Sequence, residues 1–205
     1  MAIVTHLYDS YAEAQRALDR LASAGIPESD VSLVANNADG WYRSDGDDRI
    51  DRDRDGTDDR AEGATAGAGI GATVGGAAGL LAGLGMMAIP GIGPVVAAGW
   101  LASTALGVAA GGTAGSIIGA LTQSGVPEDD AHLYAEGVRR GGTLLTVRVP
   151  ESDRSRIESL LSTSAVDVRA RANDYRAAGW SRFDETSPHL TADEVRRERS
   201  RYGSL

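Results

Sequence analysis

The chain has 205 residues, a formal net charge of −9 and no cysteine. The absence of cysteine excludes disulfide bonds and metal sites built on thiolates. The negative charge argues against nucleic acid as a partner, because binding phosphates requires an excess of Lys and Arg on some face. It also disfavours simple electrostatic docking on anionic lipid.

The N-terminal segment is predicted to form a β-α-β unit. Ala2–Tyr8 is short, apolar and rich in β-forming residues, which indicates a strand. Ser10 and Glu13 form a capping box that begins a helix, and Gly25 supplies the helix stop. Val31–Asn36 then predicts a second strand. The chain does not start with a basic segment followed by an apolar one, so we expect cytoplasmic synthesis without export.

Residues 37–62 are rich in Asp, Arg and Gly and are predicted to form a solvated acidic loop. Within this loop, Asp51, Asp53, Asp55 and Glu62 match the D-x-D-x-D-G-x5-E pattern of a calcium loop. Carboxylates on alternate residues, a glycine for the sharp turn and a distal Glu would together wrap one Ca²⁺ ion. An acidic residue stands at a position that is usually apolar, and the surroundings are of low complexity. A charged loop without metal is therefore the simpler interpretation.

The segment from Gly63 to Pro127 contains no Asp, Glu, Lys or Arg, although 24% of the whole chain is charged. Glycine recurs at every fourth residue on both sides of the sequence AIPGIGP. Residues four apart form a ridge along a helix, so each side would present a smooth strip that lets two backbones approach closely. We therefore predict an antiparallel glycine-zipper helical hairpin over residues 63–125. Its packing positions are Gly67, Gly71, Gly75, Gly79, Gly83, Gly107, Gly111, Gly115 and Gly119.

Two environments would stabilise such a hairpin. Glycine costs roughly 1 kcal/mol relative to Ala in a solvated helix, so the arms need either tight burial or a membrane. At about 1.5 Å per residue, each arm is long enough to cross a hydrocarbon core of about 30 Å. Membrane lipid at the inner membrane is thus the expected partner. The mild hydrophobicity of Ala and Gly and the acidic flanks support the alternative, a soluble cytoplasmic homo-oligomer with a buried hairpin.

The chain after the glycine-rich segment is predicted to return to an α+β pattern. Pro127 is a good first helical residue, and the three acidic residues that follow favour the positive helix N-terminus. This helix should end at Gly141. Thr143–Val149 and Ala165–Ala170 are expected strands, and Glu151–Thr163 is an expected helix between them.

Without its middle, the chain has two β-α-β halves, which is the element order of a ferredoxin-like split βαβ domain. We expect an α+β fold in which residues 1–36 and 126–170 share one four-stranded antiparallel sheet. Residues 63–125 would be inserted between the halves. Residues 171–205 form an aromatic and charged tail whose last helix is capped by Thr191 with Glu194.

No catalytic constellation is evident in the sequence. His6, His132 and His189 are scattered without ligand spacing, and no Ser-His-Asp order, paired-carboxylate context or phosphate-binding loop stands out. We therefore expect a protein that is not an enzyme and has no small-molecule substrate.

The sequences VSLVAN, AIPGIGPVVAAG within the glycine zipper, and YAEGVRRGGTLLTV together resemble the bacterial general-stress, heat-induced (YflT-type) protein family. The resemblance covers about Ala2 to Arg169 and implies a stress-associated protein with no catalytic residues to carry over. The expected function is that of a non-catalytic protein whose α+β domain lies in the cytoplasm and whose hairpin anchors it to a membrane or to copies of itself. The alternative is a soluble, calcium-responsive oligomer with the Asp51–Glu62 loop as its sensor.

Overall fold

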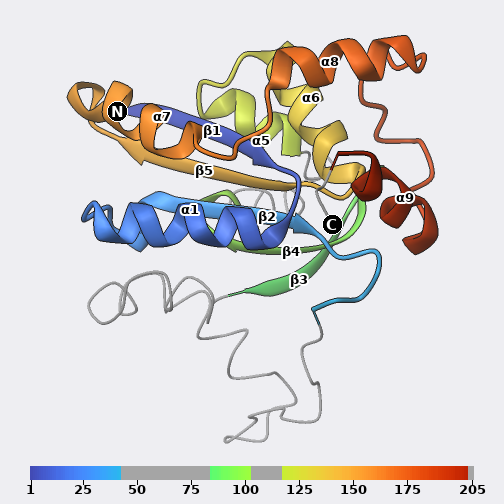
Figure 1. The fold of residues 1–205 in the computed structure, drawn as a ribbon, viewed down its shortest axis with the longest axis horizontal. Helices are drawn as coiled ribbons and strands as arrows, with labels where there is room; N and C mark the ends of the chain where they lie inside the picture. The colour runs from blue at the N-terminus through green and yellow to red at the C-terminus, as the bar shows by residue number, and fades with distance from the viewer. Residues whose placement is uncertain (43–83, 103–116, 203–205) are drawn as a thin grey trace, which may run out of the picture.

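A computed structural model describes residues 1–42, 84–102 and 117–202, and this part of the chain is an α+β fold built on a five-stranded antiparallel sheet (Figure 1). The strand order is β1-β5-β2-β4-β3. The strands are β1 (Ala2–Tyr8), β2 (Val31–Asn36), β3 (Gly85–Ile89), β4 (Gly93–Gly99) and β5 (Thr143–Val149). The helices are α1 (Tyr11–Ser23), α5 (Ile117–Gln123), α6 (Glu128–Arg139), α7 (Arg154–Ser162), α8 (Val168–Ala177) and α9 (Ala192–Tyr202), with short 3-10 helices at Glu28–Asp30 and Glu151–Asp153.

Strands β1, β2 and β5 have the bounds predicted from the sequence and form a split β-α-β unit. β5 lies between β1 and β2 and runs antiparallel to both, so β1 and β2 are parallel to one another. The predicted capping box at the start of α1 is confirmed. The N–H of Glu13 donates to Ser10 Oγ at 3.2 Å, and the N–H of Ser10 donates to Glu13 Oε2 at 3.3 Å.

The fourth predicted strand, Ala165–Ala170, is wrong. Val168 begins helix α8 instead, and the Asp167 side chain caps this helix by accepting two backbone N–H groups at 3.0 and 3.1 Å. The alternating sequence favours a strand, but the helix buries Ala172 and Tyr175 against α6. Packing with a distant helix therefore overrides the local pattern. Within the described residues no strand pairs with the outer edge of β1, so the complete ferredoxin-like sheet is not present.

The helical hairpin predicted over residues 63–125 is wrong over residues 85–99, where the structure has two strands, whereas Ile117–Gln123 near the end of the predicted second arm is helical as α5. β3 and β4 form a β-hairpin, and β4 pairs with β2. The turn lies where it was predicted, with Gly91 and Gly93 at φ values of 73° and 95°, which favour glycine. Val95 and Val96 after the turn are fully buried, and their branched side chains favour a strand. No helix in the described ranges is long and apolar enough to cross a membrane.

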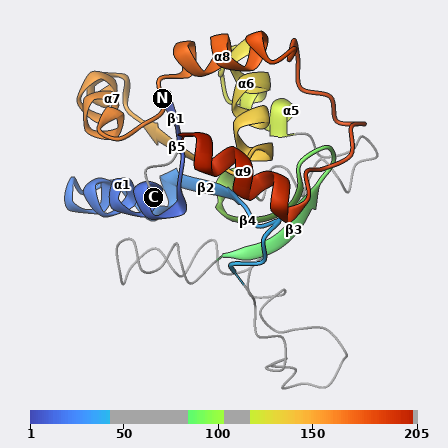
Figure 2. The ribbon, with the colours of Figure 1, turned by 45° about the vertical axis from the view of Figure 1, so that its right-hand side comes forward.

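Helices cover both faces of the sheet and bury two apolar clusters. α1 and α7 pack on one face through Leu18, Leu21 and Ile157. α5 and α6 pack on the other face through Leu121 and Val138. α8 lies outside α6, and α9 crosses one end of the sheet (Figures 1 and 2). At the α9 end of the sheet, Arg199 donates to Asn36 O of β2, and at the outer edge of β1 the N–H of Val166 donates to Leu7 O.

Candidate functional site

Strand β1 is an edge strand that pairs only with β5 among the described residues. In an antiparallel ladder, the N–H and C=O groups of alternate residues point away from the partner strand. In β1 these outward residues are Ile3, Thr5 and Leu7. Thr5 O accepts the hydroxyl of Tyr134 at 3.1 Å, and Leu7 O accepts the N–H of Val166 at 2.8 Å. The outward N–H groups of Ile3, Thr5 and Leu7 have no hydrogen-bond acceptor in the described part of the chain.

A groove of about 190 Å³ follows this edge. Strand β1 contributes four consecutive residues, and one helix of each sheet face contributes a side. The residues that line the groove are Ile3, Val4, Thr5, His6, Gly125, Val126, Pro127, Asp130, Tyr134, Arg154 and Glu158. The groove therefore exposes strand backbone between α6 and α7, which is the geometry required to add a further strand to a sheet.

The titratable side chains of the groove comprise two neutral groups, an ion pair and one exposed carboxylate, that of Asp130. Burial raises the pKa of Tyr134 to about 12, and Asp130 and Glu158 add to the shift, so the hydroxyl remains a donor at neutral pH. Burial lowers the pKa of His6 against an opposing effect of Glu158, so His6 is neutral at the same pH. Arg154 lies 4.0 Å from Glu158 across one turn of α7. The groove thus offers main-chain hydrogen-bonding groups, a surface ion pair and the carboxylate of Asp130.

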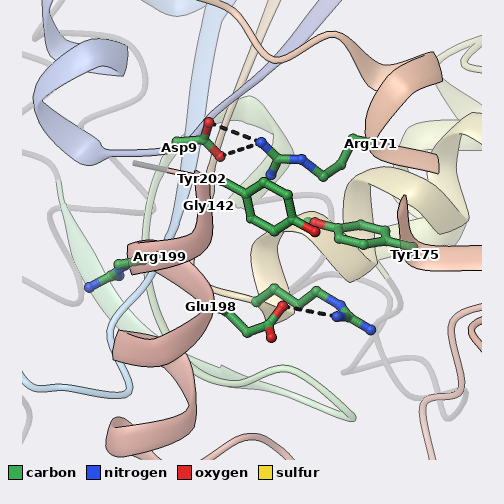
Figure 3. A pocket seen from close by; sticks show the side chains of 9 residues that line it. Asp9, Gly142, Arg171, Tyr175, Glu198, Arg199 and Tyr202 are labelled. Carbon is green, nitrogen blue, oxygen red and sulfur yellow. Dashed lines mark hydrogen bonds and ion pairs between the residues drawn. The ribbon is translucent and has the colours of Figure 1, made fainter. Parts of the chain in front are cut away.

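A second polar cluster lies where the C-terminal tail meets the sheet (Figure 3). Arg140 donates to Glu136 at 2.6 Å and to Glu198 of α9 at 2.9 Å. Its guanidinium carbon also lies 4.4 Å from the centre of the Tyr175 ring. The Glu136 side chain is 1% exposed, so the network is buried at its centre. A buried carboxylate requires such partners, because an unpaired charge in the interior is strongly destabilising.

Two further arginines complete the tail cluster. Arg171 donates to Asp9 at 3.0 Å, and its guanidinium carbon lies 3.7 Å from the centre of the Tyr202 ring. Arg199 donates to two backbone carbonyls at 2.9 and 3.1 Å, the first of which belongs to Gly141. The cavity among these side chains is about 10 Å³, which is room for about one water molecule. Because the arginines already have acceptors, we interpret the cluster as the docking surface of the tail.

The residues predicted to bind calcium, Asp51, Asp53, Asp55 and Glu62, lie outside the described residues, and that site stays a prediction. Over residues 1–42, 84–102 and 117–202, no group of His, Cys, Asp or Glu is arranged to hold a metal ion. Gly119 of the predicted zipper is half-buried in α5. The other zipper positions also lie outside the described residues: Gly67, Gly71, Gly75, Gly79, Gly83, Gly107, Gly111 and Gly115.

Sequence reasoning missed both the open edge and the docking of the tail. The edge is open because Ala165–Ala170, which alternates like a strand, does not pair along β1. The tail had a detectable signal, because Gly141 and Gly142 follow two arginines at the end of α6. By themselves, these glycines indicate only a helix stop. In the structure, a Cβ on Gly141 would lie 2.8 Å from Val195 of α9, so the glycine also makes room for the tail.

Comparisons of the chain with protein-family models, with curated proteins and with solved structures give no significant match. The resemblance of VSLVAN and YAEGVRRGGTLLTV to the bacterial general-stress family therefore stays a prediction from sequence motifs. The geometry of the β1 edge is the remaining guide to function.

Proposed function

We propose that the protein is a non-catalytic, stress-associated interaction protein that binds a second copy of itself through the outer edge of β1. The observation that supports this proposal is the row of outward N–H groups on β1, of which those of Ile3 and Thr5 lie in a groove between two helices. Unpaired backbone groups at a sheet edge are a template for pairing with another strand. Strand addition would give these donors acceptors and cover the groove.

The charges on α7 favour a second copy as the partner. A two-fold axis perpendicular to the sheet would place β1 antiparallel to its copy and α7 antiparallel to its copy. Arg154 and Glu158 are one helical turn apart, and both line the groove. Between antiparallel copies of such a helix, the basic residue of each lies beside the acidic residue of the other. This self-complementarity is the property that an isologous interface requires.

Sedimentation of the full chain over a range of concentrations tests the proposal with the protein itself as the probe. Ile3→Pro removes an outward N–H and keeps the ladder with β5, whereas Ile3→Ala removes the same side chain and keeps the N–H. Because the interface is two-fold symmetric, Ile3→Pro removes one hydrogen bond from each copy, at roughly 1 kcal/mol each. It should therefore weaken dimerisation about tenfold or more relative to Ile3→Ala. A wild-type chain that stays monomeric, or equal affinities for the two variants, would refute the proposal. Circular dichroism controls for folding.

We also propose that the glycine-rich residues on either side of the β3–β4 hairpin attach the protein to membrane lipid. The support is the charge-free sequence from Gly63 to Pro127, in which hydrocarbon burial carries no penalty for ionised groups. Fractionation of native cells is the test. Retention in the membrane pellet through a high-salt wash, with release by detergent, is the expected result. Recovery in the soluble fraction would end the membrane proposal and leave the β1 edge unaffected.

A further inference from the structure

We infer that residues 165–170 form a sixth strand on β1 in an alternative state of the chain, and that this strand closes the edge to a second copy. The sixth strand would block self-association only if the protein associates through β1, so this consequence rests on the proposed function. The strand itself is argued from the register, the side chains and the hinge of the segment.

The first rung of the sixth strand is already present. Val166 donates its N–H to Leu7 O at 2.8 Å, which is the bond that an added antiparallel strand would make at this position. Continued in register, Val168 would lie opposite Thr5, and Ala170 would lie opposite Ile3. The outward N–H groups of Thr5 and Ile3 would then find carbonyl acceptors along the length of the groove.

The side chains of the segment suit the two sides of the groove. The even-numbered residues would share the α6 face with Ile3, Thr5 and Leu7, and they are apolar: Val166, Val168 and Ala170. Val166 and Val168 already pack against the apolar cluster on that face. The odd-numbered Asp167 and Arg169 would face α7, which contributes Arg154 and Glu158 to the groove. Each charge of the segment therefore has an opposite charge on the same side.

The state in which the segment is helical depends on a small part of α8. Asp167 caps the helix, and in its first turn Arg169 and Ala170 are exposed while Val168 is half-buried. Ser164, just before the segment, has a φ of 67°, a left-handed conformation that non-glycine residues rarely adopt. The hinge of the rearrangement is thus strained. Because Arg171 binds Asp9 directly after the segment, unwinding the first turn would also loosen the tail.

Disulfide trapping tests the register, since the chain has no cysteine of its own. In the sixth strand, Val4 and Arg169 form a non-hydrogen-bonded pair with Cα atoms about 4.5 Å apart, within the range of a disulfide. Under mild oxidation, the Val4→Cys/Arg169→Cys variant should form an intramolecular disulfide about tenfold or more faster than Val4→Cys/Ala170→Cys, whose second cysteine would project to the opposite face. Arg169 and Ala170 are both exposed in α8, so cysteines at these two positions are equally accessible to the oxidant in the helical state. Equal rates, or no disulfide in either variant, overturn the inference.

Two single substitutions should move the equilibrium in opposite directions. Asp167→Ala removes the cap of α8 and should raise the strand population about fivefold. Val168 is the first residue of α8, a position that favours proline, so Val168→Pro should keep the helix. The proline lacks the N–H that would donate to Thr5 O in the sixth strand, so the strand population should fall. Amide hydrogen exchange of Ile3 and Thr5 reads the same equilibrium if Val4→Cys fails to fold. Protection should be highest in Asp167→Ala and lowest in Val168→Pro, and any other order counts against the sixth strand.

Self-association is measured separately, so the two proposals can fail independently. The oxidised Val4→Cys/Arg169→Cys variant should remain monomeric at concentrations where the wild type dimerises. A wild type that does not dimerise, together with selective disulfide formation, removes the proposed function and keeps the sixth strand. A wild type that dimerises through β1, without selective disulfide formation, does the reverse.

Discussion

At the scale of single residues, the absence of a side chain at Gly141 is what allows the tail to dock. Gly141 has a φ of 105°, and a Cβ built there would lie 2.8 Å from Val195 and 2.9 Å from Arg199. Its carbonyl accepts Arg199 at 2.9 Å. The same residue therefore ends α6, provides space for α9 and binds its arginine.

Gly141→Ala should displace α9, and Gly125→Ala is the matched control. Gly125 has a φ of 98°, but nothing lies within 4 Å of its hypothetical Cβ, so only backbone strain acts there. We expect a loss of about 1–2 kcal/mol for Gly125→Ala and about 2–4 kcal/mol for Gly141→Ala, whose excess comes from the clash with α9. Urea unfolding gives the free energies, and limited proteolysis reports release of the tail. Equal losses without added cleavage would show that α9 does not depend on this glycine.

At the scale of elements, local caps determine where several helices begin. The predicted capping box of α9 is confirmed, because the N–H of Thr191 donates to Glu194 at 2.8 Å and the N–H of Glu194 donates to Thr191 Oγ1 at 3.4 Å. Ala165–Ala170 shows the limit of such signals. The segment has the alternation of a strand and, in Asp167, the cap of a helix, so its local sequence alone does not select either element.

Ser10→Ala should lower the free energy of unfolding by about 1 kcal/mol, because it leaves the N–H of Glu13 without its acceptor. Ser23→Ala at the other end of α1 is the control. Its exposed hydroxyl donates to Asp19 O at 2.8 Å, so its loss should change stability by less than about 0.5 kcal/mol. The shift in urea midpoint at constant slope measures both. A Ser10→Ala midpoint no lower than that of Ser23→Ala would contradict the role of the cap.

At the scale of the whole molecule, buried tyrosines connect layers of the fold. Tyr8 donates to Leu161 O of α7 at 2.8 Å, and Tyr134 of α6 donates to Thr5 O at 3.1 Å. These bonds tie helices on opposite faces to the same edge strand. Tyr175 lies in the tail cluster. Burial raises the pKa of Tyr134 and of Tyr175 to about 12 and raises that of Tyr8 as well.

Stability should therefore fall as the pH rises from about 10 to about 12. An unfolded tyrosine loses its proton near pH 10, whereas these folded tyrosines retain theirs up to about pH 12. Between these values the unfolded state binds fewer protons, so alkali favours unfolding by up to about 1.4 kcal/mol per pH unit for each tyrosine. Urea unfolding at pH 9 and pH 11 measures the loss, and Tyr134→Phe should reduce it. Equal stability at the two pH values would contradict the burial of these hydroxyls.

Local sequence signals were enough to predict β1, β2 and β5, the capping boxes of α1 and α9, and the position of the turn between Gly91 and Gly93. These features depend on neighbouring residues: alternation, caps and glycine conformations act within a few positions of the chain. Two other features depend on the tertiary fold: β4 joins β2, where Val34 pairs with Ala97, and Ala165–Ala170 leaves the edge of β1 open. The docking of the tail on Gly141 likewise depends on the tertiary fold. Each of these depends on contacts between residues far apart in the chain, whose free energies can outweigh a local preference of about 1 kcal/mol.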